Sequence, residues 1–206
     1  MLKIEFRDKT PKRRTNPGSF TKHQDHKPDL KVDFGSYCGY CHSHDMFKQT
    51  YYEVDHFIPM DFLKKNNSII KSTTYKNLVY SCRHCNNAKR NKWPSKSETI
   101  YFHENEGFID PCDENYSKQF YRCERGRIYG ETLLGKWMAK TFKFQVRERQ
   151  IELIWQLRNI HLTIQELLKE QSKFRVNSGT WIKIDKQLFN SYRLYYEYDQ
   201  ELRNFQ

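Results

Sequence analysis

The sequence has no apolar run of the ~20 residues that a membrane-spanning helix needs. Its first ten residues, MLKIEFRDKT, also lack the apolar centre of a secretory signal peptide. No internal repeat and no low-complexity tract is present, which excludes repeat architectures and disordered tails of biased composition. These absences favour a globular protein of the cytoplasm with no membrane partner.

Acidic residues are also in short supply. The 206 residues include 36 Lys and Arg against 25 Asp and Glu, which gives a formal charge of +11. Such an excess predicts a polyanionic partner, although solubility alone is the alternative. Hydrophobic residues make up 37% of the chain and aromatic residues 16%, so a core of modest size must rely on Tyr and Phe rings.

Composition divides the chain into three parts. Residues 1–33 carry nine Lys and Arg interrupted by three prolines, which predicts an extended basic arm, either laid along phosphates or frayed in solvent. Residues 34–98 hold the chemical motifs. Residues 99–206 predict a small hairpin before residue 131 and then two helices, from about Lys140 to Lys173 and from about Lys186 to Phe205. The two helices are expected to pack as a hairpin or to bind a partner.

Six cysteines without a secretory signal argue for a metal and against disulfides. Four of them form two C-x-x-C pairs, Cys38 with Cys41 and Cys82 with Cys85. Two pairs of thiolates can close a tetrahedral zinc site that has no open position, as structural zinc centres do. Ordinary buried thiols or a redox pair are the alternative. Cys112 and Cys123 lie outside the pattern and are expected in the core.

The stretch EVDHFIP, at positions 53–59 between the two cysteine pairs, places Asp55 directly before His56. Neighbouring side chains of a regular strand point to opposite faces, so their cooperation predicts a bend, for which Pro59 is suitably placed. A neutral imidazole can take a proton from water near pH 7, and a carboxylate oxygen suits a divalent cation. The pair therefore predicts metal-assisted hydrolysis.

Asn86 directly follows Cys85, so a zinc site would also fix the direction of its amide. Its oxygen, together with Asp55, would leave most of a cation's coordination sphere open to water and phosphate oxygens. The alternative is an Asn that caps the helix expected from about Cys85 to Lys92.

The order of these motifs resembles the HNH endonuclease family, the zinc-knuckle branch of the ββα-metal nucleases. C-x-x-C is followed by E-V-D-H-x-x-P, by Asn77-Leu78 and by C-x-x-C-N-x-x-K, over about residues 34–94. The resemblance implies an α+β fold with a ββα core and a four-Cys structural zinc site, followed by a hairpin and a helical C-terminal region. It also implies two kinds of metal, structural Zn²⁺ and catalytic Mg²⁺ or Mn²⁺.

The resemblance implies a role for each matching residue. His56 corresponds to the general base and Asp55 to the first metal ligand. Asn77 corresponds to the residue that pins the loop orienting the base. Asn86 stands where many members have the His that ligates the metal. Glu53 would orient a water or the base, or else be a surface residue of the strand.

The implied reaction is a one-metal hydrolysis of DNA phosphodiesters in which His56 activates water for in-line attack. Lys89, Arg90 and Lys92 follow on the expected helix, and at least one of them is expected to contact the DNA backbone, with solvated side chains as the alternative.

Residues 107–130 and the long helix after them resemble HNH proteins of bacterial antiphage defence, of the Septu and retron-associated types. That resemblance implies control by a partner ATPase, with the helical region as the docking surface. Two other functions stay open, a zinc-stabilised nucleic-acid-binding module without cleavage and a homing or mobile-element HNH nuclease.

Overall fold

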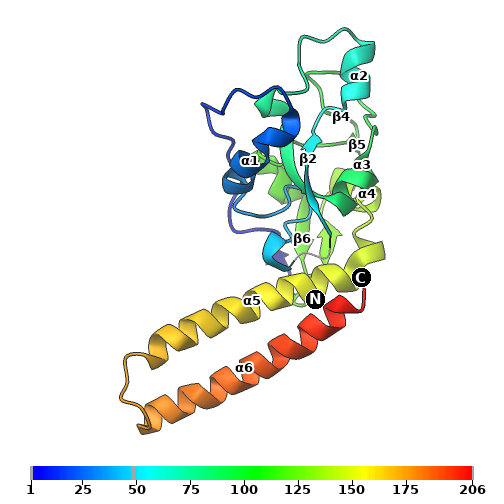
Figure 1. Cartoon of the computed structure of the whole chain (residues 1–206). Coiled ribbons are helices and arrows are strands. Elements are labelled where there is room, and N and C mark those ends of the chain that lie inside the picture. Colours follow the sequence, from blue (N-terminus) through cyan, green and yellow to red (C-terminus); the bar gives the residue numbers. More distant parts are fainter. Residues whose placement is uncertain (1, 48–49, 206) are drawn as a thin grey trace.

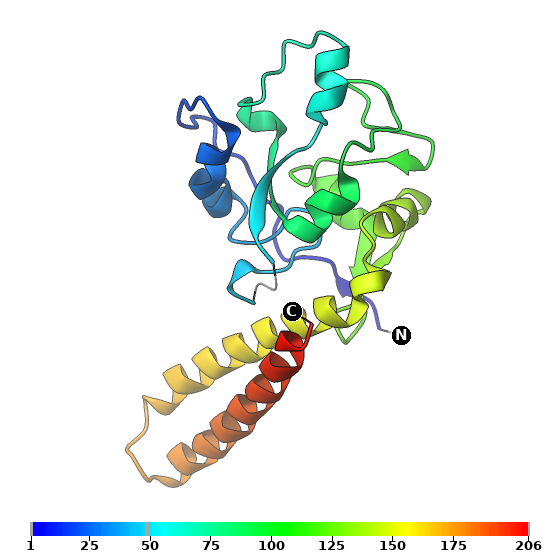
Figure 2. The same cartoon turned by 45° about the vertical axis from the view of Figure 1, so that its right-hand side comes forward.

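The computed structural model describes residues 2–47 and 50–205. The shorter elements gather in one body, and two long helices extend from it side by side (Figures 1 and 2). The helices are α1 (Lys27–Asp33), α2 (Met60–Lys65), α3 (Arg83–Lys89), α4 (Leu133–Thr141), α5 (Glu148–Gln171) and α6 (Gly179–Arg203). The strands are β1 (Ile4–Glu5), β2 (Tyr52–His56), β3 (Leu78–Cys82), β4 (Phe102–His103), β5 (Glu106–Gly107), β6 (Phe120–Arg122) and β7 (Ile128–Gly130). Short 3-10 helices are η1 (His23–His26), η2 (Asp45–Phe47), η3 (Tyr75–Asn77), η4 (Glu114–Gln119) and η5 (Gln145–Arg147).

The motif-bearing segment forms two antiparallel strands followed by a helix. β2 and β3 pair from Tyr52 opposite Cys82 to His56 opposite Leu78. α3 begins directly after β3 and contacts both strands. Every residue of β3 is buried, as in a strand that is covered on both faces. The ββα order that the resemblance implies is therefore present.

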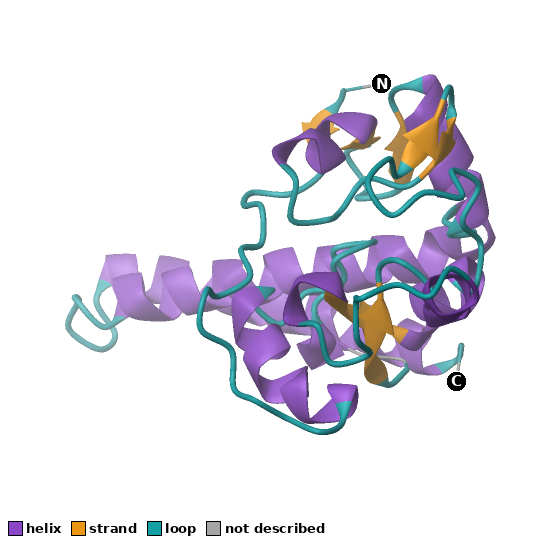
Figure 3. Cartoon of the chain, turned by 90° about the horizontal axis from the view of Figure 1, so that it is seen from above, coloured by secondary structure: helices purple, strands orange, loops and turns teal. Residues whose placement is uncertain are grey.

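A second, three-stranded sheet has the order β1-β6-β7. Its β6–β7 pair is the small hairpin expected before residue 131, and β1 adds the start of the chain to its edge. Seen from above, the strands form separate small groups and not one continuous sheet (Figure 3). The buried Arg122 of β6 ties this sheet to the loop of the first cysteine pair, because it donates to the carbonyl oxygens of Phe6, Cys41 and Gly126.

The basic N-terminal segment is packed against the rest of the fold. Arg13 forms an ion pair with Asp110 at 2.9 Å and donates to the Leu78 carbonyl, while Arg7 is buried and donates to the Pro111 carbonyl. The interpretation as a frayed, solvated terminus is therefore wrong for these residues. Because their guanidinium groups are engaged internally, they do not offer the free charge that a strap along phosphates requires.

The helical region begins differently from the sequence prediction. The single helix expected from about Lys140 is divided into α4 and α5, because Phe142 and Phe144 both turn into the core and are fully buried. Lys143, between them, adopts a positive φ of 56° that ends the first helix. α6 begins seven residues before the expected Lys186, where the Ser178 hydroxyl accepts from the Trp181 N–H as an N-cap.

α5 and α6 pack against each other along their apolar faces, as expected for a helical hairpin. Two clusters of buried side chains hold them together. The cluster nearer the body comprises Phe47, Leu153, Leu157 and Leu202, and the outer one Ile160, Ile164, Ile184 and Leu188. No helix in the described part of the chain combines the length and the hydropathy needed to cross a bilayer.

Two glycines provide a test of this packing. A Cβ at Gly135 in α4 would lie 1.9 Å from the Gln119 carbonyl oxygen, whereas one at Gly179 would meet nothing within 4 Å. We expect Gly135→Ala to lower the free energy of unfolding by about 1–3 kcal/mol, because backbone must move to admit the methyl group. Gly179→Ala is the control and should leave stability unchanged or raise it by up to about 1 kcal/mol. Urea denaturation measures both, and equal midpoints would contradict this close packing of α4.

Candidate active site and metal centre

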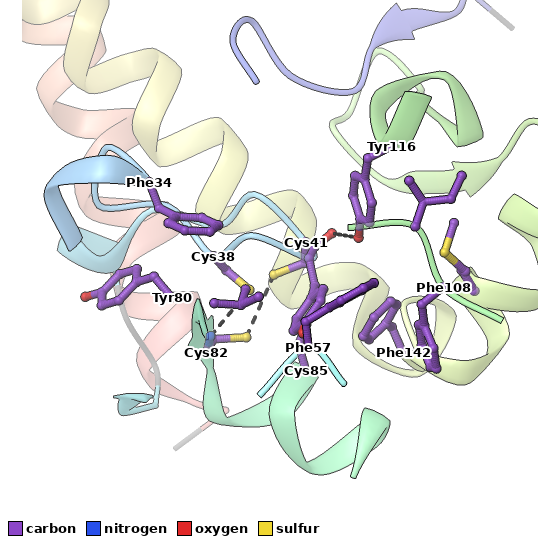
Figure 4. Close-up of a cluster of buried hydrophobic side chains, with 14 of the residues drawn as sticks. Phe34, Cys38, Cys41, Phe57, Tyr80, Cys82, Cys85, Phe108, Tyr116 and Phe142 are labelled. Atoms are coloured by element: carbon purple, nitrogen blue, oxygen red, sulfur yellow. Dashed lines mark hydrogen bonds between the residues drawn. The ribbon is translucent and has the colours of Figure 1, made fainter. Parts of the chain in front are cut away.

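The four cysteines of the two C-x-x-C pairs come together in one buried cluster. Their Sγ atoms all lie within 4.8 Å of one another, and the Sγ atoms of Cys41 and Cys82 are 3.8 Å apart. A tetrahedral zinc ion with Zn–S distances of about 2.3 Å requires Sγ atoms about 3.8 Å apart. The cluster therefore fits zinc in size, ligand type and number, and it lies inside the aromatic core (Figure 4).

Two donors point to sulfur atoms of the cluster. The backbone N–H of Cys82 points to Cys38 Sγ at 3.3 Å, and the Arg147 guanidinium donates to Cys85 Sγ at 3.4 Å. Hydrogen bonds with neighbouring thiols, that of Cys38 first, lower the pKa of Cys41 well below its ordinary value and raise that of Cys82, while burial raises the pKa of Cys85. Four thiolates around one Zn²⁺ leave two negative charges, and Arg147 supplies one positive charge beside them. Arg147, which the sequence analysis missed, thereby connects the C-terminal region to the cluster.

One face of β2 meets one face of α3. Glu53 and Asp55 are two residues apart on the strand, and Asn86 and Lys89 are three apart on the helix, so each pair shares a face. Asn86 Nδ2 donates to Glu53 Oε2 at 2.8 Å, and Lys89 Nζ lies 3.3 Å from Asp55 Oδ2. The strand and the helix thus form two neighbouring pairs, Glu53 with Asn86 and Asp55 with Lys89.

Asp55 is held from two sides. Its Oδ2 accepts from the Tyr40 hydroxyl at 2.6 Å and faces Lys89. In the described part of the chain, no hydrogen bond is made to Oδ1, nor to the amide oxygen of Asn86. These two hard oxygens are the atoms available to a divalent cation such as Mg²⁺, with water and phosphate oxygens completing its coordination. The donor set therefore fits the ligands expected from the sequence, Asp55 and Asn86.

Lys89 requires a correction. It was grouped with Arg90 and Lys92 as a candidate for the DNA backbone, but its side chain is fully buried. Its ammonium donates to the His56 carbonyl at 2.7 Å and pairs with Asp55, while burial lowers its pKa. A buried ammonium cannot reach a phosphate, so Lys89 positions the two motif residues, and only Arg90 and Lys92 are exposed.

His56 lies at the end of β2 with its ring held by a backbone carbonyl. The strand stays in register through His56, so the bend expected between Asp55 and His56 is wrong and the chain turns only afterwards. Nε2 lies 2.8 Å from the Ser72 carbonyl oxygen, and since a carbonyl only accepts, Nε2 carries the proton and Nδ1 is the acceptor. Burial lowers the pKa of His56, which favours the neutral imidazole that proton abstraction needs.

Asn77 fastens the turn that follows His56. Its side chain accepts from the Ile58 N–H at 2.8 Å and donates to the Ile58 carbonyl at 3.0 Å. Its own carbonyl accepts from the Phe57 N–H. Three hydrogen bonds from one buried residue hold the turn, which is the geometry expected of a residue that pins the loop after His56.

Two site residues were not found from the sequence. The ring of His23 in η1 lies 4.5 Å from that of His56, centroid to centroid, so the N-terminal segment covers one side of the imidazole. Tyr40, inside the first knuckle, reaches Asp55. The C-G-Y-C motif places Tyr40 between two of the four cysteines, but nothing in the sequence indicates that its hydroxyl donates to Asp55. The contact of His23 depends on the path of the N-terminal segment.

Substitution of the cysteines tests the metal centre. We expect Cys85→Ser to reduce bound zinc well below one equivalent per chain and to lower Tm, because a closed site contributes folding energy through all four ligands. Cys112→Ser, outside the cluster, should keep both the zinc content and the Tm near those of the wild type. Elemental analysis and thermal unfolding, with and without a chelator, measure these effects. Unchanged zinc in Cys85→Ser would contradict the four-thiolate site.

Comparison with known proteins bears on the same segment. No curated protein and no solved structure matches the chain. Residues 38–92 match the family model described as HNH endonuclease, and that range includes both cysteine pairs, Asp55, His56, Asn77 and Asn86. The match supports an HNH-type nuclease, an enzyme that binds nucleic acid, in this part of the chain.

Proposed function

We propose that this chain is a metal-dependent HNH endonuclease that hydrolyses DNA phosphodiester bonds. The observation that carries the proposal is the meeting of β2 and α3, which sets Glu53 against Asn86 and Asp55 against Lys89, with His56 next to Asp55 at the end of the strand. These are the residues that a phosphodiester hydrolase needs, a base of suitable pKa and hard oxygen ligands for a cation.

In the proposed reaction His56 activates the nucleophile. Its Nδ1 accepts a proton from water, while the Nε2–H bond to Ser72 keeps the ring in the required tautomer. The turn fixed by Asn77 keeps the end of β2 in place while the proton moves. The activated water attacks phosphorus in line, and the departing group is the 3′ oxygen.

Asp55 and Asn86 are the proposed ligands of a Mg²⁺ or Mn²⁺ ion, which when bound neutralises charge on the phosphate and on the departing oxygen. Tyr40 and Lys89 hold the other carboxylate oxygen of Asp55, so Oδ1 is pre-positioned. Glu53 orients the amide of Asn86 through its Nδ2, which turns the amide oxygen away from Glu53.

Cleavage of plasmid and oligonucleotide DNA tests the proposal. We expect His56→Ala to reduce the cleavage rate by about 10²–10⁴-fold, because general base catalysis is lost. Wild-type cleavage should require added Mg²⁺ or Mn²⁺. His103→Ala removes an exposed imidazole from β4 and should cleave like the wild type.

Two outcomes would redirect this assignment. A His56→Ala protein as active as the wild type would exclude His56 as the base. DNA binding by a correctly folded, zinc-loaded wild type that does not cleave would favour the alternative, a zinc-stabilised nucleic-acid-binding module.

We further propose that the enzyme serves in bacterial antiphage defence and is controlled by a partner ATPase. The resemblance of residues 107–130 and the long helix to defence nucleases supports this role. The hairpin of α5 and α6 adds a physical reason, because α6 exposes Phe189 and Tyr196 to 67% and 64%, with Tyr192 half exposed between them. These rings recur at helical spacing on one face, as in a docking helix. A homing or mobile-element nuclease, the alternative, would not need this surface.

Co-expression with an ATPase encoded beside this chain tests the partner. Phe189→Glu and Tyr196→Glu should abolish co-purification while DNA cleavage by the isolated chain stays unchanged, since both side chains are exposed on α6, outside the segment that carries the motifs. Ile69→Glu changes a residue that is 93% exposed outside the hairpin and should leave co-purification intact. A chain that stays alone and fully active in such cells would argue against the partner.

A further inference from the structure

A cleft of about 630 Å³ lies between α3 and the turn from α4 to α5. Figure 1 shows α3 and α4 next to each other. Five of its lining residues are cationic, and none of its lining residues is acidic. The five are Arg90, Lys92, Lys143, Arg147 and Arg149. A concave surface lined by charge of one sign concentrates the field and selects an anion.

Two of the five cations, Arg90 and Lys143, are free to bind a ligand. Arg147 donates to Cys85 of the cysteine cluster and Arg149 pairs with Glu201, so both are committed, and the Lys92 ammonium donates to the Ala88 carbonyl at 3.1 Å. In the described part of the chain no ion pair is made by Arg90 or Lys143, and both are exposed. The free charge therefore comes from both walls, Arg90 after α3 and Lys143 after α4.

The backbone at two of these cations is unfavourable for a side chain. Arg90 ends α3 at φ 46° and ψ −131°, and Lys143 follows α4 at φ 56°. Glycine is the residue that ordinarily follows a helix in such conformations. A cation near a helix C-terminus gains some stabilisation from the helix dipole. That effect does not explain why cations that follow two different helices line one cleft without acidic residues. Positive φ alone does not mark the site, because Lys96 shares it outside the cleft; the convergence of Arg90 and Lys143 on one cleft without acidic residues does.

The position of the cleft indicates what the anion is. Asn87, which lines the cleft, directly follows Asn86 on α3, so the cleft and the proposed metal ligand share this helix, on different faces of it. A nucleic acid cleaved at the proposed site and crossing the end of α3 would bring its next phosphates to Arg90 and Lys143. Phe205, 45% exposed at the same cleft, offers a ring on which a base can stack.

We propose that this cleft binds the phosphate backbone of the nucleic-acid substrate beyond the scissile phosphate, with Arg90 and Lys143 as contacts from opposite walls. This inference rests on the proposed nuclease function for the identity of the ligand. It assigns to the C-terminal half of the chain a share of substrate binding, because Lys143 lies outside the HNH core.

Glycine substitutions test the cleft without disturbing the fold. Arg90→Gly and Lys143→Gly each remove a charge and relieve a positive φ, so Tm should hold or rise. Lys96→Gly is the matched control, because Lys96 is also an exposed cation at positive φ, 49°, and does not line the cleft. Binding of a labelled DNA duplex would be measured by anisotropy between about 50 and 200 mM salt, without added Mg²⁺ or Mn²⁺.

We expect Arg90→Gly and Lys143→Gly each to weaken binding and to reduce the slope of log K against log salt by about 0.9, and the double variant by about twice that. A slope reduced as much in Lys96→Gly as in the cleft variants, or unchanged in both cleft variants, would overturn the cleft as the binding site. Because binding is measured separately from cleavage, a wild type that binds DNA through the cleft without cutting it would leave this inference standing and remove the nuclease assignment alone.

Discussion

Four thiolates that must meet at one point constrain the rest of this fold. They come from a loop after α1 and from the junction of β3 with α3, so bringing them together fixes where the strand ends and the helix starts. Because the four Sγ atoms lie within 4.8 Å of one another, the segment between the two cysteine pairs, including β2, must fold back on itself. The same cluster receives Arg147 from the turn before α5, so the direction in which the helical hairpin leaves the body is set at the metal centre.

The face shared by β2 and α3 follows from that junction. Once Cys85 fixes the first turn of α3, the helical repeat carries Asn86 to Glu53 and Lys89 to Asp55. Burying an ammonium is costly unless it is paired and hydrogen-bonded, and Lys89 meets both conditions with Asp55 and the His56 carbonyl. The internal ion pair thus stabilises the end of β2 at Asp55 and His56, and the charge of Lys89 is neutralised inside the protein.

The sequence predicted those parts of the fold that depend on short-range pattern and on ligand chemistry. The two C-x-x-C pairs indicated their own convergence, and the β-prone residues around Val54 and the apolar repeat from Leu153 indicated a strand and a helix. What it could not predict depends on contacts between distant segments. The break before α5 exists because Phe142 and Phe144 are buried in the core. The helical pattern of the sequence does not predict this break. Lys89 reads as a surface cation in sequence and is buried only because Asp55 lies opposite.

The contact between His23 and His56 extends the proposed catalytic unit beyond the segment that matches the HNH model. The segment that matches the HNH model begins at residue 38, yet the ring covering the imidazole comes from η1, fifteen positions earlier in the chain, and Arg13 and Arg14 anchor that segment to Asp110 and Asp33. A core transplanted alone into another protein would carry every motif residue and still expose His56 to solvent on one side. The environment of the proposed base therefore depends on the surrounding chain, and exchanging the N-terminal segment would alter that environment without touching a motif.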